Sequence, residues 1–167
     1  MVSFAIRPLD SDADTSGFHC GETALDDYLQ RYASQDVKRG IARVFVASPI
    51  DQPHEVAGFF TLSAAGISAE ALPDRLRKKL PRYPVPVALL GRLAVSRKVQ
   101  GQGLASILLA DACKKVNTAS QTLAVMAIVV DAKTPQAAEF YRRFGFIDLS
   151  GQSGRLILPR SHFATLG

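Results

Sequence analysis

A short glycine-rich turn between an apolar strand pattern and a helix pattern has the residue types needed to bind an anion. It lies within residues 93–106, which read Leu-Ala-Val-Ser-Arg-Lys-Val-Gln-Gly-Gln-Gly-Leu-Ala-Ser. Gly101 and Gly103 allow the backbone to approach a ligand closely, because neither carries a side chain. The first turn of the following helix offers backbone N–H groups without intrahelical partners and a partial positive charge. We therefore predict that this turn binds a pyrophosphate.

Two common phosphate loops do not fit these residues. The dinucleotide fingerprint needs a third glycine where this chain has Ser106, and the Gly-Lys-Ser/Thr of a nucleoside-triphosphate loop is missing. The remaining pattern, Gln100-x-x-Gly103-x-Ala105, resembles the acyl-CoA loop of the GNAT N-acetyltransferases. An ordinary tight turn is the alternative on these residues alone.

A second segment supports the same family. The continuous apolar run 123–130 predicts a strand that is buried on both faces. After it, Thr134 can cap a helix, Pro135 suits its first turn and Gly145 suits its end. Residues 137–146, Ala-Ala-x-Phe-Tyr-x-x-Phe-Gly-Phe, resemble the last characteristic segment of GNAT enzymes. With both segments in the right order and spacing, the chain is identified as a member of that family.

The resemblance implies one acetyltransferase domain over residues 1–167, with acetyl-CoA as cosubstrate and no metal. In the family, the strand that here ends at 93–95 splays from its neighbour, and coenzyme A lies in the opening. The implied cofactor-binding residues are Leu93, Ala94, Val95, Gln100, Gly101, Gln102, Gly103, Leu104, Ala105, Ser106, Ala132, Ala138 and Tyr141. Gln100 replaces the commoner arginine and removes one charge near the pyrophosphate. The main donors are backbone N–H groups, so we expect activity to survive.

Hydrophobic periodicity predicts the elements that position these residues. Strand patterns occur at 4–6, 42–47, 56–63, 85–95, 123–130, 146–149 and 156–158. Apolar residues at helical spacing occur at Leu25, Tyr28, Leu29 and Tyr32, at Leu72 and Leu76, after Gly103 and after Pro135. This alternation predicts an α/β fold with a mixed, mostly antiparallel sheet of about seven strands and about four flanking helices. Residues 150–154 are expected to join the last two strands as a hairpin.

Length and composition fit one domain without a membrane span. A chain of 167 residues, 47% of them hydrophobic, buries about 70% of its unfolded surface. No run approaches the roughly 18 apolar residues of a membrane span, and the N-terminus lacks a secretory layout, so we expect a cytoplasmic protein. Cys20 and Cys113 are expected to be free thiols, the latter in the core. His19, His54 and His162 lack metal-site spacing and are expected to have local roles.

Charge is distributed unevenly along the chain. Residues 1–30 carry a net charge of −5, and residues 31–167 carry +10. A solvated helix face explains a single basic cluster. Several separated clusters instead indicate a long polyanion such as RNA, bound through its phosphates.

The strand 88–95 contains no carboxylate, although many GNAT relatives place a glutamate base there. Without a base, the attacking amine must already be neutral. At pH 7 a lysine amine, with a pKa of about 10.4, is roughly 0.04% neutral, whereas an α-amine of pKa about 7.7 is roughly 17% neutral. This difference favours α-amines in general and does not by itself select RNA.

Tyr141 is the predicted general acid, because a phenol can give a proton to the departing coenzyme A thiolate. A core tyrosine is the alternative. Backbone N–H groups near Val95 would meet the oxyanion, as in related enzymes.

A narrower resemblance, to the acetyltransferase toxins of type II toxin–antitoxin systems, is carried by residues 18–29, 33–36, 80–86 and 91–95. It implies acetylation of the α-amine of aminoacyl-tRNA, arrest of translation, a ribbon-helix-helix antitoxin, a homodimer, and operator DNA bound only through the antitoxin complex. The candidate tRNA contacts are Lys38, Arg39, Arg43, Arg77, Lys78, Lys79, Arg82 and Arg92. A GNAT enzyme for a small amine or protein, and a non-catalytic coenzyme A-binding module, remain as alternatives.

Overall fold

The computed structural model describes residues 3–149 and 154–163. Its seven strands follow the order β1-β2-β3-β4-β5-β7-β6. The pairs β1–β2, β2–β3, β5–β7 and β6–β7 are antiparallel, and β4–β5 is parallel. The predicted mixed, mostly antiparallel α/β sheet is thus confirmed. The chain forms two compact units, Met1–Ser63 with Arg92–Ala112 (unit 1) and Ala64–Gly91 with Cys113–Gly167 (unit 2).

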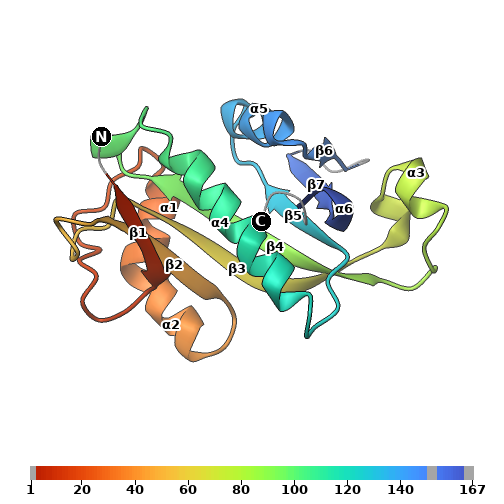
Figure 1. The fold of residues 1–167 in the computed structure, drawn as a ribbon, viewed down its shortest axis with the longest axis horizontal. Helices are drawn as coiled ribbons and strands as arrows, with labels where there is room; N and C mark the ends of the chain where they lie inside the picture. The colour runs from red at the N-terminus through yellow and green to blue at the C-terminus, as the bar shows by residue number, and fades with distance from the viewer. Residues whose placement is uncertain (1–2, 150–153, 164–167) are drawn as a thin grey trace. The chain divides into compact units, whose positions relative to one another are not determined.

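The elements are labelled in Figure 1. The strands are β1 Phe4–Pro8, β2 Arg43–Pro49, β3 Gly58–Ile67, β4 Val85–Val95, β5 Ala127–Asp131, β6 Ile147–Asp148 and β7 Arg155–Pro159. The α-helices are α1 Thr23–Asp27, α2 Ala33–Lys38, α3 Asp74–Arg77, α4 Leu104–Ala119, α5 Pro135–Phe144 and α6 Arg160–Phe163. A π-helical turn (η1, Tyr28–Tyr32) and two 3₁₀ turns (η2, Ala69–Ala71; η3, Arg97–Val99) complete them.

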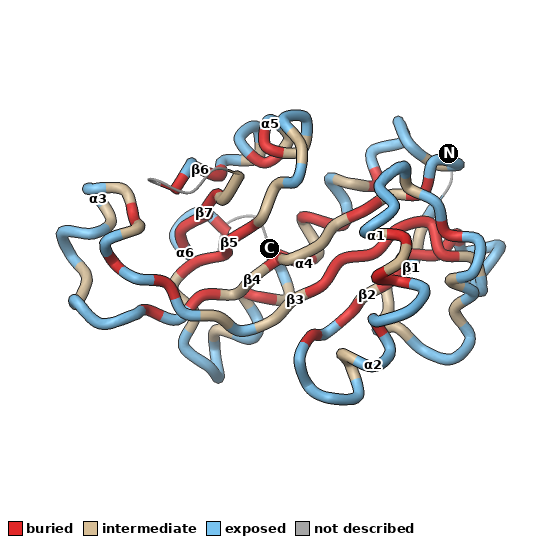
Figure 2. The backbone as a smooth tube through the Cα atoms, turned by 180° about the vertical axis from the view of Figure 1, so that it is seen from behind, coloured by how far each residue is buried: buried red, intermediate tan, exposed pale blue. Residues whose placement is uncertain are grey.

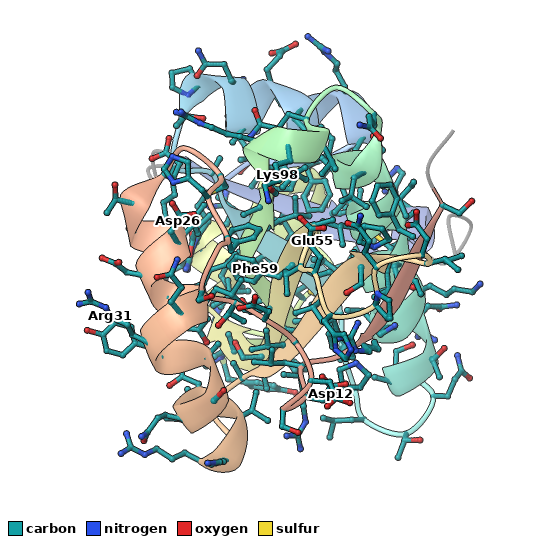
Figure 3. All side chains as sticks on the ribbon, turned by 90° about the vertical axis from the view of Figure 1, so that its left-hand side faces the viewer. Asp12, Asp26, Arg31, Glu55, Phe59 and Lys98 are labelled. Atoms are coloured by element: carbon teal, nitrogen blue, oxygen red, sulfur yellow. The ribbon has the colours of Figure 1, made fainter. Side chains whose placement is uncertain are left out.

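In unit 1, helices cover both faces of the strands, and two neighbouring residues of β3 mark the two sides. Phe59 is fully buried in a core with Tyr28 and other apolar residues of the N-terminal helices (Figure 3). A Cβ added at Gly58 would lie 3.0 Å from Leu108 and 3.2 Å from Leu104, both on α4. Because successive strand residues point to opposite faces, α4 packs on the other side.

The predicted apolar face of the first helix is confirmed except at its last residue, Tyr32. Tyr28 and Leu29 are buried, whereas Tyr32 is 56% exposed. The reason is the π-helical turn, in which the N–H of Ala33 donates to the carbonyl of Tyr28, five residues back. The wider turn moves Ala33 onto the buried face in place of Tyr32, so α1, η1 and α2 continue as one helix with a shifted stripe (Figure 1).

In unit 2, the predicted strand 123–130 begins later than expected. The N–H of Leu123 donates to the carbonyl of Ala119 at 2.9 Å, so these residues form the turn that ends α4, and Leu123 is 64% exposed. β5 itself is buried on both faces, as predicted (Figure 2).

The predicted helix through Leu72 and Leu76 is also corrected. Pro73 separates η2 from α3, because proline lacks the N–H that a continuous helix needs. Leu72 is nevertheless buried.

β6 and β7 pair antiparallel, in agreement with a hairpin, although 150–153 of the predicted connection lie outside the described residues. α6 was not predicted. In the part of the chain that the structure describes, no helix is long and apolar enough to cross a membrane.

Candidate active site

The glycine turn of unit 1 has the geometry expected of an anion-binding loop. Gly101 and Gly103 have φ values of 85° and 80°, a left-handed region that favours glycine. A Cβ added at either would meet no atom within 4 Å, so space is open above the turn. The N–H of Ile107 donates to the carbonyl of Gly103, which leaves the first amides of α4, at Leu104, Ala105 and Ser106, without intrahelical acceptors.

Gln100 holds this turn against two other segments of unit 1. Its Nε2 donates to the carbonyl of Val95 and to the carbonyl of Cys20, both at 3.0 Å. Both protons of the side-chain amide are thereby used within the protein, which leaves anion binding to the backbone N–H groups. Sequence reasoning missed this role, since Cys20 is 80 residues away.

The end of β4 leads directly into the turn. Ala94 is buried, and Leu93 and Val95 are half-buried. The described β4–β5 ladder pairs Ala88–Leu90 with Ile128–Val130, whereas β4 continues to Val95.

The predicted helix that carries Tyr141 is confirmed, together with the residues that cap it. Thr134 Oγ1 accepts the N–H of Ala137 at 3.1 Å, and Pro135 occupies the first turn. Gly145 ends the helix with φ 115°, and the N–H of Phe146 donates to the carbonyl of Tyr141 at 3.1 Å. These caps fix the rotation of α5 and hence the direction of the Tyr141 side chain.

Tyr141 is 5% exposed, and its ring contacts those of Phe140 and Phe146 at centroid distances of 5.3 and 5.4 Å. Burial, and then the negative charge of Asp131, raise the pKa of Tyr141. The phenol therefore keeps its proton at neutral pH, as a general acid must. No described protein group hydrogen-bonds its hydroxyl, yet the described residues contain no buried side-chain oxygen without a partner. The hydroxyl thus retains access to the surface.

Other predicted cofactor residues of unit 2 lie around the same helix. The N–H of Ala132 donates to the carbonyl of Gly154 at 2.7 Å, and Ala138 is buried on α5. Arg155 donates to both carboxylate oxygens of Asp131, at 2.8 and 3.2 Å, and so lowers the pKa of that carboxyl. This ion pair, which the sequence pattern did not reveal, keeps the Asp131 carboxyl ionised.

The predicted tRNA-contact residues fall in both units. Lys38, Arg39 and Arg43 are exposed in unit 1, and Arg77, Lys78, Lys79 and Arg82 are exposed in unit 2. Arg92 differs from them because it is half-buried, with its guanidinium carbon 3.5 Å from the centroid of the Tyr28 ring.

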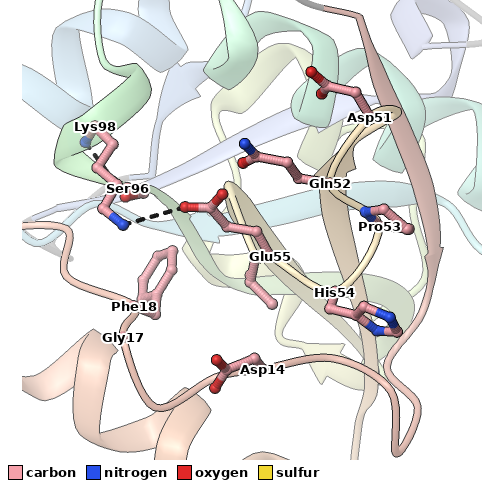
Figure 4. A pocket seen from close by; sticks show the side chains of 11 residues that line it. Asp14, Gly17, Phe18, Asp51, Gln52, Pro53, His54, Glu55, Ser96 and Lys98 are labelled. Carbon is pink, nitrogen blue, oxygen red and sulfur yellow. Dashed lines mark hydrogen bonds and ion pairs between the residues drawn. The ribbon is translucent and has the colours of Figure 1, made fainter.

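A cavity of about 570 Å³ lies in unit 1 beside Ser96 (Figure 4). Asp14, Asp51 and Glu55 line it together with Lys98, which pairs with Glu55 at 3.2 Å. Three carboxylates against one ammonium group make it unsuited to a polyanionic cofactor. The glycine turn remains the better cofactor site, although it is open rather than enclosed.

The thiols and histidines are not arranged for other chemistry. Burial raises the pKa of Cys20 and of Cys113 to about 11, so both are protonated at neutral pH, and Cys113 is in the core as predicted. His19 Nδ1 lies 3.2 Å from Asp26, and His54 contacts a backbone carbonyl. Within residues 3–149 and 154–163, no group of three His, Cys, Asp or Glu side chains could hold a metal ion.

Known proteins are similar to this chain in sequence and in fold. The profile of the Acetyltransferase (GNAT) domain matches residues 40–148. A tRNA-acetylating toxin of Mycobacterium tuberculosis is 41% identical over 137 residues, which are 81% of this chain and 80% of the toxin. AtaT complexed with acetyl-methionyl-tRNAfMet has a TM-score of 0.91 at 32% identity, covering 98% of this chain and 99% of AtaT. An AtaT tyrosine-to-phenylalanine variant, bound to the C-terminus of antitoxin AtaR and acetyl-CoA, has a TM-score of 0.83 at 28% identity. The match covers 98% of this chain and 97% of the AtaT variant. With the glycine turn, the extended β4 and the capped tyrosine helix all present, the chain belongs to the GNAT acetyltransferase family.

Proposed function

We propose that this enzyme transfers an acetyl group from acetyl-CoA to the α-amine of aminoacyl-tRNA and thereby blocks translation. The observation that carries the proposal is the 41% identity to a tRNA-acetylating toxin over 81% of the chain. The absence of a carboxylate from residues 88–95 supports an amine acceptor of low pKa.

The residues present fit acetyl-CoA. Its pyrophosphate would accept hydrogen bonds from the backbone N–H groups of the turn and of the first turn of α4, at 101–106. Leu93, Ala94 and Val95 would bind the acyl-pantetheine through their backbone. Ala132 and Ala138 are the further proposed contacts. Once bound, the cosubstrate supplies a thioester that is activated for attack by an amine.

The chain's own groups then perform two tasks. A backbone N–H near Val95 would stabilise the negative charge that develops on the acetyl oxygen. The N–H groups of Ser96 and Arg97 already donate to the carbonyls of Ala57 and His19. Tyr141 donates its phenolic proton to the departing thiolate sulfur as the carbon–sulfur bond breaks. The attacking nitrogen, now bonded to the acetyl carbon, loses its extra proton to water, and the phenolate regains a proton from solvent. The α-amine needs no strong base, because a useful fraction of it is neutral at pH 7.

The proposed macromolecular partners follow from the same relatives. The basic residues of both units would bind phosphates of tRNA, and a ribbon-helix-helix antitoxin would neutralise the enzyme. Operator DNA would be bound only through that antitoxin. We also propose a homodimer. Because charged tRNA is used in the cytoplasm, the enzyme would act there.

The test is transfer of radiolabelled acetyl from acetyl-CoA to charged total tRNA, run beside uncharged tRNA and a lysine-rich protein. We expect label on charged tRNA alone, on the amino acid released by mild alkali. Label on the protein only would favour a protein acetyltransferase. Cofactor binding without any transfer would favour a non-catalytic module.

A further inference from the structure

The side chain of Arg92 is held against an aromatic ring that is itself fixed. Its guanidinium carbon lies 3.5 Å from the centroid of Tyr28, a stacking distance. Tyr28 is 6% exposed, its hydroxyl donates to Asp36 Oδ2 at 2.8 Å, and the ring of Phe59 is inclined to it by only 13°. Asp36 and the core therefore determine where the tyrosine ring lies, and the ring determines where the guanidinium lies.

The stack leaves the donors of Arg92 available. A guanidinium has five N–H donors in its plane, whereas stacking occupies only its face. Among the described residues, Arg92 makes no ion pair and no hydrogen bond, and none of its nitrogens is a buried atom without a partner. An oriented, partly desolvated fork with free donors is suited to bidentate recognition of an oxyanion.

Burial, and then the hydrogen bond to Asp36, raise the pKa of Tyr28 to about 12. The phenol therefore stays neutral through the physiological range. Its role toward Arg92 is that of a neutral aromatic surface, and Asp36 contacts the hydroxyl end of that surface.

Arg92 and Val95 lie on the same strand, three positions apart. An extended strand rises about 3.3 Å per residue, which separates them by about 10 Å. In aminoacyl-tRNA, the α-amine is joined through an ester to the ribose of the terminal adenosine, and the nearest phosphate is on the 5′ side of that nucleotide. The distance between that phosphate and the α-amine is of the same order as the distance between Arg92 and Val95.

We propose that Arg92 binds the 5′-phosphate of the terminal nucleotide of aminoacyl-tRNA, with Tyr28 and Asp36 as its positioning residues. The inference rests on the proposed function, since it takes the acetyl group to be transferred near Val95. It assigns Arg92 to one phosphate next to the reacting amine, unlike the exposed basic residues, which would contact phosphates further along the RNA.

The test uses two small acceptors that differ by one phosphate. Each is a 3′-amino-3′-deoxyadenosine with an aminoacyl group in a stable amide linkage, one with a 5′-phosphate and one without. Wild type should prefer the phosphorylated acceptor. In Arg92→Gln we expect the KM for that acceptor to rise about 10- to 100-fold, as charge-assisted hydrogen bonds predict, and the preference to disappear. Arg160→Gln, which removes an equal charge from α6, should keep the preference.

Three outcomes separate the possibilities. If Arg92→Gln slows both acceptors equally, Arg92 does not recognise the phosphate and the inference is overturned. If wild type acetylates charged tRNA but neither small acceptor, the salt dependence of the KM for tRNA is compared between wild type and Arg92→Gln. Loss of one phosphate-binding cation should lower the slope of log KM against log salt by about 0.7 to 0.9. An unchanged slope rejects the inference. If wild type acetylates neither charged tRNA nor either acceptor, the proposed function itself fails.

The positioning role is tested at Tyr28. Tyr28→Leu should reduce the preference for the phosphorylated acceptor as Arg92→Gln does. The double variant should show no further loss of this preference, because both substitutions remove the same interaction. Tyr28→Phe keeps the ring, loses the Asp36 bond and should give an intermediate preference. The ratio of kcat/KM for the two acceptors does not depend on the folded fraction, so instability of Tyr28→Leu would not imitate the effect. An unchanged ratio in Tyr28→Leu would reject the positioning role.

Discussion

At the scale of residues, Tyr141 combines a buried ring with a hydroxyl that no described protein group engages. Phe140 and Phe146 pack against the ring, and the caps of α5 fix its direction. Because this hydroxyl retains access to the surface, the packing of the ring leaves it available to donate a proton to a ligand.

Replacement of Tyr141 by phenylalanine separates these two roles. The ring contacts remain, and no hydrogen bond among the described residues is broken, so the free energy of unfolding should change little. The proton source disappears, so kcat for acetyl transfer should fall about 100- to 10,000-fold while the dissociation constant for acetyl-CoA stays nearly constant. Single-turnover transfer and calorimetric titration with acetyl-CoA measure the two quantities. Normal turnover in the variant would reject Tyr141 as the acid.

At the scale of elements, the position of the glycine turn depends on how closely α4 approaches the strands of unit 1. A Cβ on Gly58 would lie 2.9 Å from the carbonyl oxygen of Ala94 and 3.0 Å from Leu108. Glycine is required here for space, whereas at Gly101 and Gly103 it is required for backbone conformation. A glycine inside a strand pattern is the signal that could have revealed this contact from sequence.

Gly58→Ala should therefore destabilise the protein by about 1 to 3 kcal/mol, because the added methyl group must displace backbone as well as side chains. Urea unfolding measures the change. Gly17→Ala is the matched control, since a Cβ there meets no atom within 4 Å and the φ of Gly17 is not in the left-handed region. Equal stability of the two variants would show that α4 can move away from β3 at little cost.

At the scale of the whole molecule, the charge distribution is the feature that most directly concerns a polyanionic substrate. The net charge is +5, and exposed basic residues occur in both units. Phosphate contacts release counterions, so affinity for tRNA should fall steeply with salt. Binding of acetyl-CoA, which has fewer charges and for which we propose backbone donors, should depend on salt much less.

Charge reversal in unit 2 tests this distribution. The triple change Lys78→Glu, Lys79→Glu and Arg82→Glu should raise the KM for charged tRNA. It should lower the slope of log KM against log salt by about one for each phosphate that the variant no longer binds. The KM for acetyl-CoA should not change. If tRNA kinetics are unaffected while the antitoxin no longer binds, these residues serve the protein partner instead.

Agreement between sequence and structure was best where local chemistry decides the conformation. Thr134, Pro135 and Gly145 delimit α5 as predicted, because capping and φ preferences act within a few residues. The predictions were wrong where a local backbone hydrogen bond overrode the hydrophobic pattern. Leu123 joins the turn after α4 instead of β5, and a π-helical turn removes Tyr32 from the buried face. Hydrophobic periodicity assumes regular elements, so it does not reveal either change.

The sequence by itself determined the family, the order of the elements, the glycine turn and the tyrosine helix, since each depends on residues that are close together in the chain. Only the tertiary structure decided which distant groups meet. It pairs the amide of Gln100 with the Cys20 carbonyl, Arg155 with Asp131, and Arg92 with the ring of Tyr28. The physical reason is that sequence spacing specifies the faces of single helices and strands, whereas contacts between elements depend on the register and packing of the whole core.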